Sequence, residues 1–248
     1  MTALVRAELL KARTVRSWWA YLIAIVLLVG IAVAGDTGTN PEAHDRLDFQ
    51  VGLVESAGFA TLLALILGIV LVTNEFRHGT ITPTFLAAPV RERVLAAKAA
   101  AATLLGLLFA VLALLVTAAI ALTWLSIVGA EIHLLDGEVA ERAAQILVSC
   151  VLFALLGVAI GTLVQSQVAA LVGTLIWAFI GETLLWGLFT LLDIEGAVGY
   201  LPFQALDGAD GTGGENLLDY WLAVAVSLGW IALVGAAGTW RTRGRDLT

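Results

Sequence analysis

Six long apolar stretches, separated by shorter polar segments, dominate the pattern of the chain. They cover residues 18–35, 51–73, 99–127, 143–164, 168–192 and 220–240. An α-helix rises about 1.5 Å per residue, so each stretch can cross a hydrocarbon layer about 30 Å thick, the first only just. Hydrocarbon offers backbone groups no partner outside their own chain, which favours helices, and the alternating segments of about 10 residues found in membrane barrels do not occur in the sequence. The pattern predicts an all-α integral membrane protein with six transmembrane helices in one domain, residues 1–248.

Lysine and arginine concentrate in three of the polar segments. Eleven of the 13 basic residues lie before the first stretch, between the second and third, or after the sixth: Arg6, Lys11, Arg13, Arg16, Arg77, Arg91, Arg93, Lys98, Arg241, Arg243 and Arg245. Cytoplasmic loops of membrane proteins carry such an excess of basic residues, so both termini are predicted to be cytoplasmic. This orientation requires an even number of spans, and six spans satisfy it.

Composition excludes a soluble enzyme. The chain is 60% hydrophobic and 13% charged, whereas a typical soluble domain is about 45–50% apolar and about 25% charged. Cys150 is the only cysteine, so no intrachain disulfide can form.

The start of the chain allows a second interpretation, a signal peptide with a cleavage site after the small residues 32–34. The apolar run is longer than the about 7–15 residues usual in such peptides, and Trp18 and Trp19 are typical of an interfacial anchor. We therefore expect a retained first helix. Cleavage would leave five spans and an external N-terminus.

The cytoplasmic segment 74–98 is longer than the about 2–8 residues that usually connect two helices. Residues before Pro83 and Pro89 are biased away from helix, and Pro89 suits the first turn of a helix that runs into the third stretch. A surface element that faces a partner and a solvated basic loop beside anionic lipid both fit this segment.

Residues 2–17 combine basic side chains with apolar ones and predict a helix lying on the membrane surface. Its apolar residues share a broad face that Glu8 and Arg16 interrupt. The charged residues of this N-terminal interfacial helix are Glu8, Lys11, Arg13 and Arg16.

Glu182 is the only ionisable residue well inside an apolar stretch. It lies about 21 Å from Val168 at helical rise, in the outer half of the fifth stretch. A carboxylate near the centre of a bilayer costs about 2.5–3.5 kcal/mol, so Glu182 should face protein or water. It lines a substrate path or forms hydrogen bonds at a helix interface.

Two further segments have a readable pattern. Gly157 and Gly161 place small residues four apart, which lets two helices approach closely, and packing within the fold is favoured over a dimer seam. Between the fifth and sixth stretches, residues 196–206 are apolar and could re-enter the outer leaflet, whereas residues 208–214 form a glycine-rich loop.

Catalytic and cofactor motifs are absent from the sequence. Its two lysines, Lys11 and Lys98, do not follow glycine, so there is no phosphate-binding loop for ATP. The three histidines lie in separate loops, no His-Glu-x-x-His or Gly-x-Ser-x-Gly motif occurs, and no metal site is expected. The chain is therefore not expected to be an enzyme or to bind a cofactor itself.

Segment 74–98 resembles the ABC type-2 permeases, the membrane subunits of bacterial ATP-driven exporters. The resemblance rests on Glu75, the pair Gly79-Thr80, then Pro89, Arg91 and Lys98 before the third stretch. The N-terminal run from Glu8 to Arg16 and the motif Tyr200-Leu-Pro202 before the last stretch fit the same family. Family members often carry another basic residue just after the Gly-Thr pair, where this chain has Thr82-Pro83.

The resemblance implies a separate ATPase subunit that binds ATP and Mg, usually two copies with two permease copies, in a bacterial plasma membrane. The second permease is either a copy of this chain or a different one, and no nucleic acid is involved. The loop between spans two and three would couple to the ATPase through Glu75, Arg77, Gly79, Thr80, Pro89, Arg91, Arg93 and Lys98. Spans two and five would line the substrate path, with Thr174, Trp177, Glu182 and Trp186 as weak candidates.

Two other classes of function remain open at this level. A secondary transporter or channel would work without an ATPase and would depend on Glu182. A membrane anchor or immunity protein would bind a partner without any flux. An apolar cavity with tryptophan and one carboxylate suits an amphipathic or cationic drug, a peptide antibiotic or a lipid-like molecule, and the sequence does not rank these.

Overall fold

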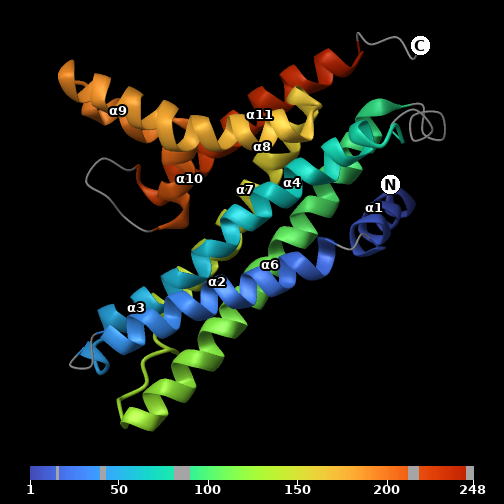
Figure 1. Cartoon of the computed structure of the whole chain (residues 1–248). Helices are drawn as coiled ribbons and strands as arrows, with labels where there is room; N and C mark the ends of the chain where they lie inside the picture. Colours follow the sequence, from blue (N-terminus) through green and yellow to red (C-terminus); the bar gives the residue numbers. More distant parts are fainter. Residues whose placement is uncertain (15–16, 40–42, 81–89, 212–217, 244–248) are drawn as a thin grey trace.

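The computed structural model describes residues 1–14, 17–39, 43–80, 90–211 and 218–243 of the chain. All of the secondary structure in these ranges is helical (Figure 1). The short N-terminal helix α1 (Thr2–Thr14) precedes the long helices. This confirms the predicted helix at the start of the chain.

Six helical segments in the described ranges are long and apolar enough to cross a membrane, as the sequence predicts. They are α2 (Ser17–Thr39), the continuous run α3–η2–α4 (Leu47–Glu55, Ser56–Gly58, Phe59–Arg77), α6 (Arg91–Val128), α7 (Gly137–Val164), α8–η3–α9 (Gln167–Ile176, Trp177–Gly181, Glu182–Leu191) and α11 (Tyr220–Arg243).

Three of these segments begin several residues earlier than the apolar pattern indicates, and α7, which begins at Gly137, is one of them. α6 begins at Arg91, so the helix after the prolines runs directly into the third stretch, as expected. The second segment begins at Leu47, because the polar residues Asp48 and Gln50 lie in helix α3 ahead of the apolar run. The prolines themselves lie in 81–89, outside the described residues.

Helices α4 and α7 approach each other most closely through glycine. A Cβ atom added to Gly157 would run into the backbone of Leu65 and the Cα atom of Gly68, and one added to Gly68 would meet the backbone of α7. Gly161 lies one turn further along α7, and a Cβ atom added to it would lie 3.0 Å from the Ile69 carbonyl oxygen. The small-residue pattern of α7 therefore serves packing inside the fold.

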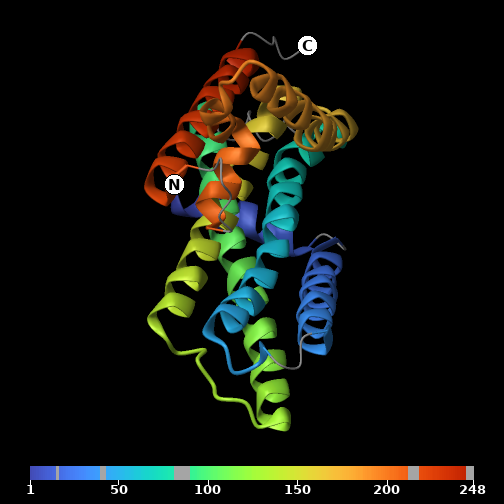
Figure 2. The same ribbon diagram turned by 90° about the vertical axis from the view of Figure 1, so that its left-hand side faces the viewer.

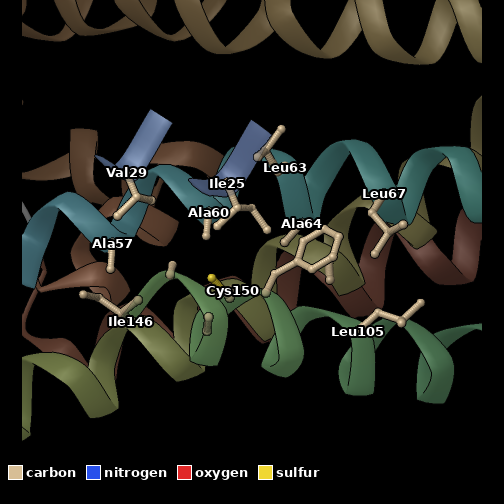
Figure 3. Close-up of a cluster of buried hydrophobic side chains, with 14 of the residues drawn as sticks. Ile25, Val29, Ala57, Ala60, Leu63, Ala64, Leu67, Leu105, Ile146 and Cys150 are labelled. Carbon is tan, nitrogen blue, oxygen red and sulfur yellow. The ribbon is translucent and has the colours of Figure 1, made fainter. Parts of the chain in front are cut away.

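The main core lies between α2, α4, α6 and α7, where apolar side chains of all four helices meet (Figure 3). Its labelled members are Ile25, Val29, Ala57, Ala60, Leu63, Ala64, Leu67, Leu105, Ile146 and Cys150. Cys150 is buried and carries a free thiol. In Figure 1, α1, the start of α6 and the end of α11 lie at one end of the bundle, and α3 lies at the other.

A smaller core joins α4, α7, α8, α10 (Pro202–Asp210) and α11. The segment after α9 forms the short helix η4 (Glu195–Tyr200) and then α10, which packs on α7 and α11. Both views place α10 beside α11 (Figures 1 and 2). The apolar piece 196–206 thus folds back onto the protein as two short helices.

We expect Gly157→Ala to destabilise the protein, because the added methyl group overlaps the backbone of α4 and must force the two helices apart. Such overpacking costs about 1–3 kcal/mol and should lower the midpoint of thermal unfolding in detergent micelles. Gly187→Ala is the matched control, since a Cβ at Gly187 meets nothing within 4 Å. Equal midpoints for both variants would contradict the packing described for α4 and α7.

Candidate functional site

Four charged side chains from three helices meet where α1 crosses the ends of α4 and α6. Lys98 Nζ lies 2.7 Å from Glu8 Oε2 and 2.9 Å from Glu75 Oε1. Lys11 Nζ lies 2.7 Å from Glu8 Oε1 and 2.7 Å from Glu75 Oε1. We call Glu8, Lys11, Glu75 and Lys98 the ion-pair cluster.

The ion-pair cluster is largely shielded from solvent. Lys98 is 0% exposed, Glu8 is 4% exposed and Glu75 is 6% exposed, whereas Lys11 lies half-exposed at the edge. Lys98 Nζ also donates a hydrogen bond to the Leu71 carbonyl oxygen at 3.1 Å. Two ammonium groups face two carboxylates, so the charges balance inside, which a buried ionic group requires.

Glu8 explains why the apolar face of the N-terminal helix is interrupted. It is the buried residue of α1, and its carboxylate points at the lysines of the ion-pair cluster. Lys11 lies three residues further along the same helix, the spacing at which side chains become neighbours. A glutamate on an apolar face, with a lysine just before a transmembrane span, was the available sequence signal for this pairing.

The electrostatics keep Lys11 charged. Burial by itself lowers the pKa of Lys11, but its hydrogen bonds with Glu75 and Glu8 outweigh burial and raise that pKa above its usual value. The ammonium form is therefore complete at neutral pH. Its contribution to stability is lost only at alkaline pH, as the pH rises through the raised pKa.

The pair Gly79-Thr80 has a local structural role at the end of α4. Gly79 adopts the left-handed conformation with φ +67°, which favours glycine. The Thr80 N–H donates to the Glu75 carbonyl oxygen at 3.0 Å, and the Gly79 N–H donates to that of Phe76 at 3.4 Å. These two hydrogen bonds together form a Schellman motif, which ends α4. The helix therefore stops shortly after Glu75, the residue that α4 contributes to the ion-pair cluster.

The remaining predicted coupling residues, and the two arginines predicted for the N-terminal interfacial helix, lie at the surface or outside the described part. Arg93 and Arg13 are exposed, and Arg77 Nη1 donates to Gln167 Oε1 at 3.1 Å, which links the end of α4 to the start of α8. Pro89 and Arg16 lie outside the described residues, and the side chain of Arg91 is not described. The predicted set thus divides into a buried pair, Glu75 and Lys98, and a basic surface.

Glu182 holds α10 against the fifth helical segment. Its carboxylate accepts hydrogen bonds from Phe203 N at 2.8 Å, Gln204 N at 3.1 Å and Trp177 Nε1 at 3.1 Å, and the residue is 1% exposed. Phe203 and Gln204 lie in the first turn of α10, where N–H groups have no partner within the helix. A carboxylate also complements the positive end of the helix dipole.

Of the other predicted path residues, some line a cavity of about 500 Å³ and one does not. Thr174 and Trp177 line this cavity, together with residues of α7, α10 and α11. Trp186 is exposed on α9 and does not belong to the lining. Among the described residues, no group of three or more His, Cys, Asp or Glu is placed to hold a metal ion.

Comparison with known families identifies the chain. The sequence model described as ABC-2 family transporter protein matches residues 4–181, well over half of the chain. The chain belongs to the ABC-2 transporter family. No curated protein matches it.

The family fits what the structure shows. ABC-2 proteins are multi-pass membrane permeases that typically have no catalytic activity and generally work with an ABC ATPase. The match covers α1 to η3 and so includes the whole ion-pair cluster of this ABC-2 protein, and it ends just before Glu182.

We expect Lys98→Met to destabilise the ABC-2 protein by about 3–5 kcal/mol, because it removes the buried ammonium and leaves two buried carboxylates with the half-exposed Lys11 as their shared partner. The double variant Lys98→Met, Glu75→Gln should lose less than the two single variants together, since the pair is removed as a unit. Thermal unfolding in detergent measures both.

Arg93→Met serves as the control for that experiment. Arg93 is exposed on the same helix, and its replacement should change stability by less than about 0.5 kcal/mol. Strictly additive losses for Lys98 and Glu75 would count against their pairing.

Glu182→Gln should loosen the start of α10, because a side-chain amide offers one acceptor oxygen where the carboxylate offers two. Leaving a buried N–H without a partner costs about 1–3 kcal/mol, so the amides of Phe203 and Gln204 should exchange with deuterium about ten- to a hundredfold faster. Glu141→Gln, at an exposed acid on α7, is the control and should leave these amides protected.

Proposed function

We propose that this chain is the permease subunit of an ATP-driven exporter, coupled to a separate ATPase at the end of the bundle that carries the ion-pair cluster. The observation that carries the proposal is the position of Glu75 and Lys98. Glu75 lies at the start and Lys98 at the end of segment 74–98, the stretch expected to face the ATPase. Both residues form ion pairs with side chains of α1, and they also pair with each other.

Coupling requires that a force on the surface segment reaches the spans. In this chain the segment leaves α4 after Arg77, two residues beyond Glu75, and returns through the start of α6, where Lys98 forms its ion pairs. Because three helices share one set of buried ion pairs, α1, α4 and α6 resist separation at this end. A push on the segment would therefore move these helices together.

The basic residues support a cytoplasmic position for this end. Arg77, Arg93 and Arg241 are exposed there, and Arg13 is exposed on α1. An excess of arginine and lysine marks the cytoplasmic side of a membrane protein. Both termini would then be cytoplasmic, in a bacterial plasma membrane.

The assembly proposed here contains two ATPase subunits, which bind ATP and Mg, and two permease subunits. The second permease is a copy of this chain or a related one. The helices α2, α8–α9 and α11 expose many large apolar side chains, which contact lipid or a second permease. The exported molecule would pass between spans, past residues such as Thr174 and Trp177.

Proton-coupled secondary transport is less well supported. It needs a carboxylate that can exchange its proton with a path, whereas Glu182 accepts hydrogen bonds on both oxygens and holds α10 in place. No observation favours a membrane anchor or immunity protein.

We expect the double variant Arg91→Glu, Arg93→Glu to weaken association with the ATPase subunit of the proposed assembly, because reversed charges oppose the complementary surface of the ATPase. Reversal of these surface charges should reduce the amount of ATPase that copurifies with the permease about three- to tenfold. It should also make the rate of ATP hydrolysis insensitive to the permease. Pull-down from membranes, followed by ATPase assays in liposomes, measures both effects.

Arg46→Glu is the control for the charge reversal. Arg46 is exposed at the other end of the bundle and pairs only locally with Asp48 at 2.6 Å. Full recovery of the ATPase with the Arg91, Arg93 variant, or an equal loss with Arg46→Glu, would rule out docking at this surface.

A further inference from the structure

Asp210, the last residue of α10, places its carboxyl group against the backbone of the second helical segment. A Cβ atom added to Gly58 would lie 3.0 Å from Asp210 Oδ2, closer than an ordinary van der Waals contact. Gly58 ends η2, the 3₁₀ turn between α3 and α4. On the other side, a Cβ atom added to Gly211 would run into the side chains of Arg142 and Gln145 on α7. The C-terminal end of α10 is therefore held between η2 and α7.

The cation at this end of α10 is already engaged. Arg142 Nη2 lies 3.1 Å from Glu55 Oε1, at the end of α3. Arg142 Nη1 donates to Gln145 Oε1 at 3.1 Å and to the Asp210 carbonyl oxygen at 3.3 Å. The guanidinium thus binds the backbone of Asp210, and its carboxylate partner is Glu55.

The Asp210 carboxyl group has one oxygen without a hydrogen bond. Its Oδ1 atom is buried and accepts none from any described residue, and the Ser149 hydroxyl of α7, which lies beside it, is buried without a partner as well. The buried Cys150 thiol is also within electrostatic reach of Asp210. A charged carboxylate in such surroundings is strongly unfavourable, and a proton removes the charge and provides an O–H donor.

The electrostatic surroundings of Asp210 favour the protonated form. Burial is the main reason why the pKa of Asp210 is raised from its usual 3.8 to about 6. The charges of Asp207, one turn back on α10, and of Glu55 raise this pKa as well, whereas the Ser149 hydroxyl and the Arg142 guanidinium lower it. The carboxyl group therefore changes its charge between mildly acidic and neutral pH.

Other titratable groups lie on α10 and on the elements that pack against it. Asp207 is exposed, and so is Glu195 on η4. Tyr220, at the start of α11, interacts with the charge of Glu141 on α7. Because Asp207 acts directly on Asp210, its titration must be separated from that of Asp210 by experiment.

We propose that the Asp210 carboxyl group is a proton-operated latch: the protonated group holds the C-terminal end of α10 against η2 and α7, and transfer of its proton to water releases that end. The group binds its proton more tightly when docked than when exposed. Acidification therefore favours the docked state, and docking weakens as the pH rises. The latch is complete within one chain and does not depend on ATP-driven export.

The position of the latch decides which solution controls it. Glu55 and η2 belong to the part of the second helical segment near α3, at the end of the bundle opposite to α1 (Figure 1). In the orientation proposed above, this is the outer side of the membrane. The latch would then respond to the pH outside the cell.

Hydrogen exchange of the backbone amides of residues 208–211 measures how often this end of α10 opens. The purified full-length protein in detergent is compared at pH 5 and pH 7, and each rate is divided by that of an unstructured peptide of the same sequence, which removes the direct effect of pH on exchange. With a pKa of about 6 when docked and 3.8 when released, the open fraction should rise about tenfold from pH 5 to pH 7 and little beyond.

Asp210→Asn imitates the protonated carboxyl group at every pH. Its corrected exchange rate should be the same at pH 5 and pH 7, and at pH 7 it should be at least about tenfold slower than in the unchanged protein. Glu195→Gln, at the exposed acid on η4, is the matched control and should keep the full tenfold pH response.

Asp207→Asn separates the two acids of α10. It should keep the pH response of residues 208–211 and move its midpoint to lower pH, because a like charge beside Asp210 is removed. The proposal is overturned by exchange in the unchanged protein that does not depend on pH, by a pH response that survives in Asp210→Asn, or by one that Asp207→Asn alone abolishes. All of these measurements are made in detergent without ATP or an ATPase, so their outcome is independent of the proposed export.

Discussion

A charge in an apolar environment must find a partner, and this constraint organises the end of the protein where α1 crosses α4 and α6. Lys98 is completely buried at the start of the longest helix, so its ammonium requires carboxylates, which Glu8 and Glu75 supply. The pairing is possible only if α1 lies across α4 and α6. The position of the N-terminal helix and the rigidity of this end therefore have the same physical cause.

The same constraint acts at Glu182, with backbone N–H groups in place of lysines. The carboxylate accepts hydrogen bonds from N–H groups at the start of α10 that have no partner within that helix. These bonds stabilise the charge of Glu182 and the end of α10 at the same time. This contact fixes Phe203 and Trp177 in the wall of the cavity. A residue read from the sequence as a candidate for the substrate path thus shapes the cavity without offering it a charge.

Length and apolarity predicted the six membrane-spanning segments, because a span must satisfy its own backbone whatever surrounds it. Glu8 and Glu182 were also visible as polar residues on apolar faces. The partners of these two residues could not be predicted from the sequence. Lys98 lies 90 residues from Glu8, and the backbone N–H groups that donate to Glu182 belong to another helix. The π-helical turn and the free hydroxyl of Thr174 depend on tertiary packing, which no local pattern encodes.

The ion-pair cluster and the cavity are connected through α8. This helix packs on α4, and its first residue, Gln167, accepts a hydrogen bond from Arg77 at the end of α4. Thr174 lies two turns further along the same helix. Because α4 is fastened by Glu75 and closely packed on α7 through glycine, a displacement at the end that carries the ion-pair cluster would move α8 together with α4 and α7. Movement that begins at segment 74–98 would therefore displace the part of the cavity wall to which Thr174 belongs.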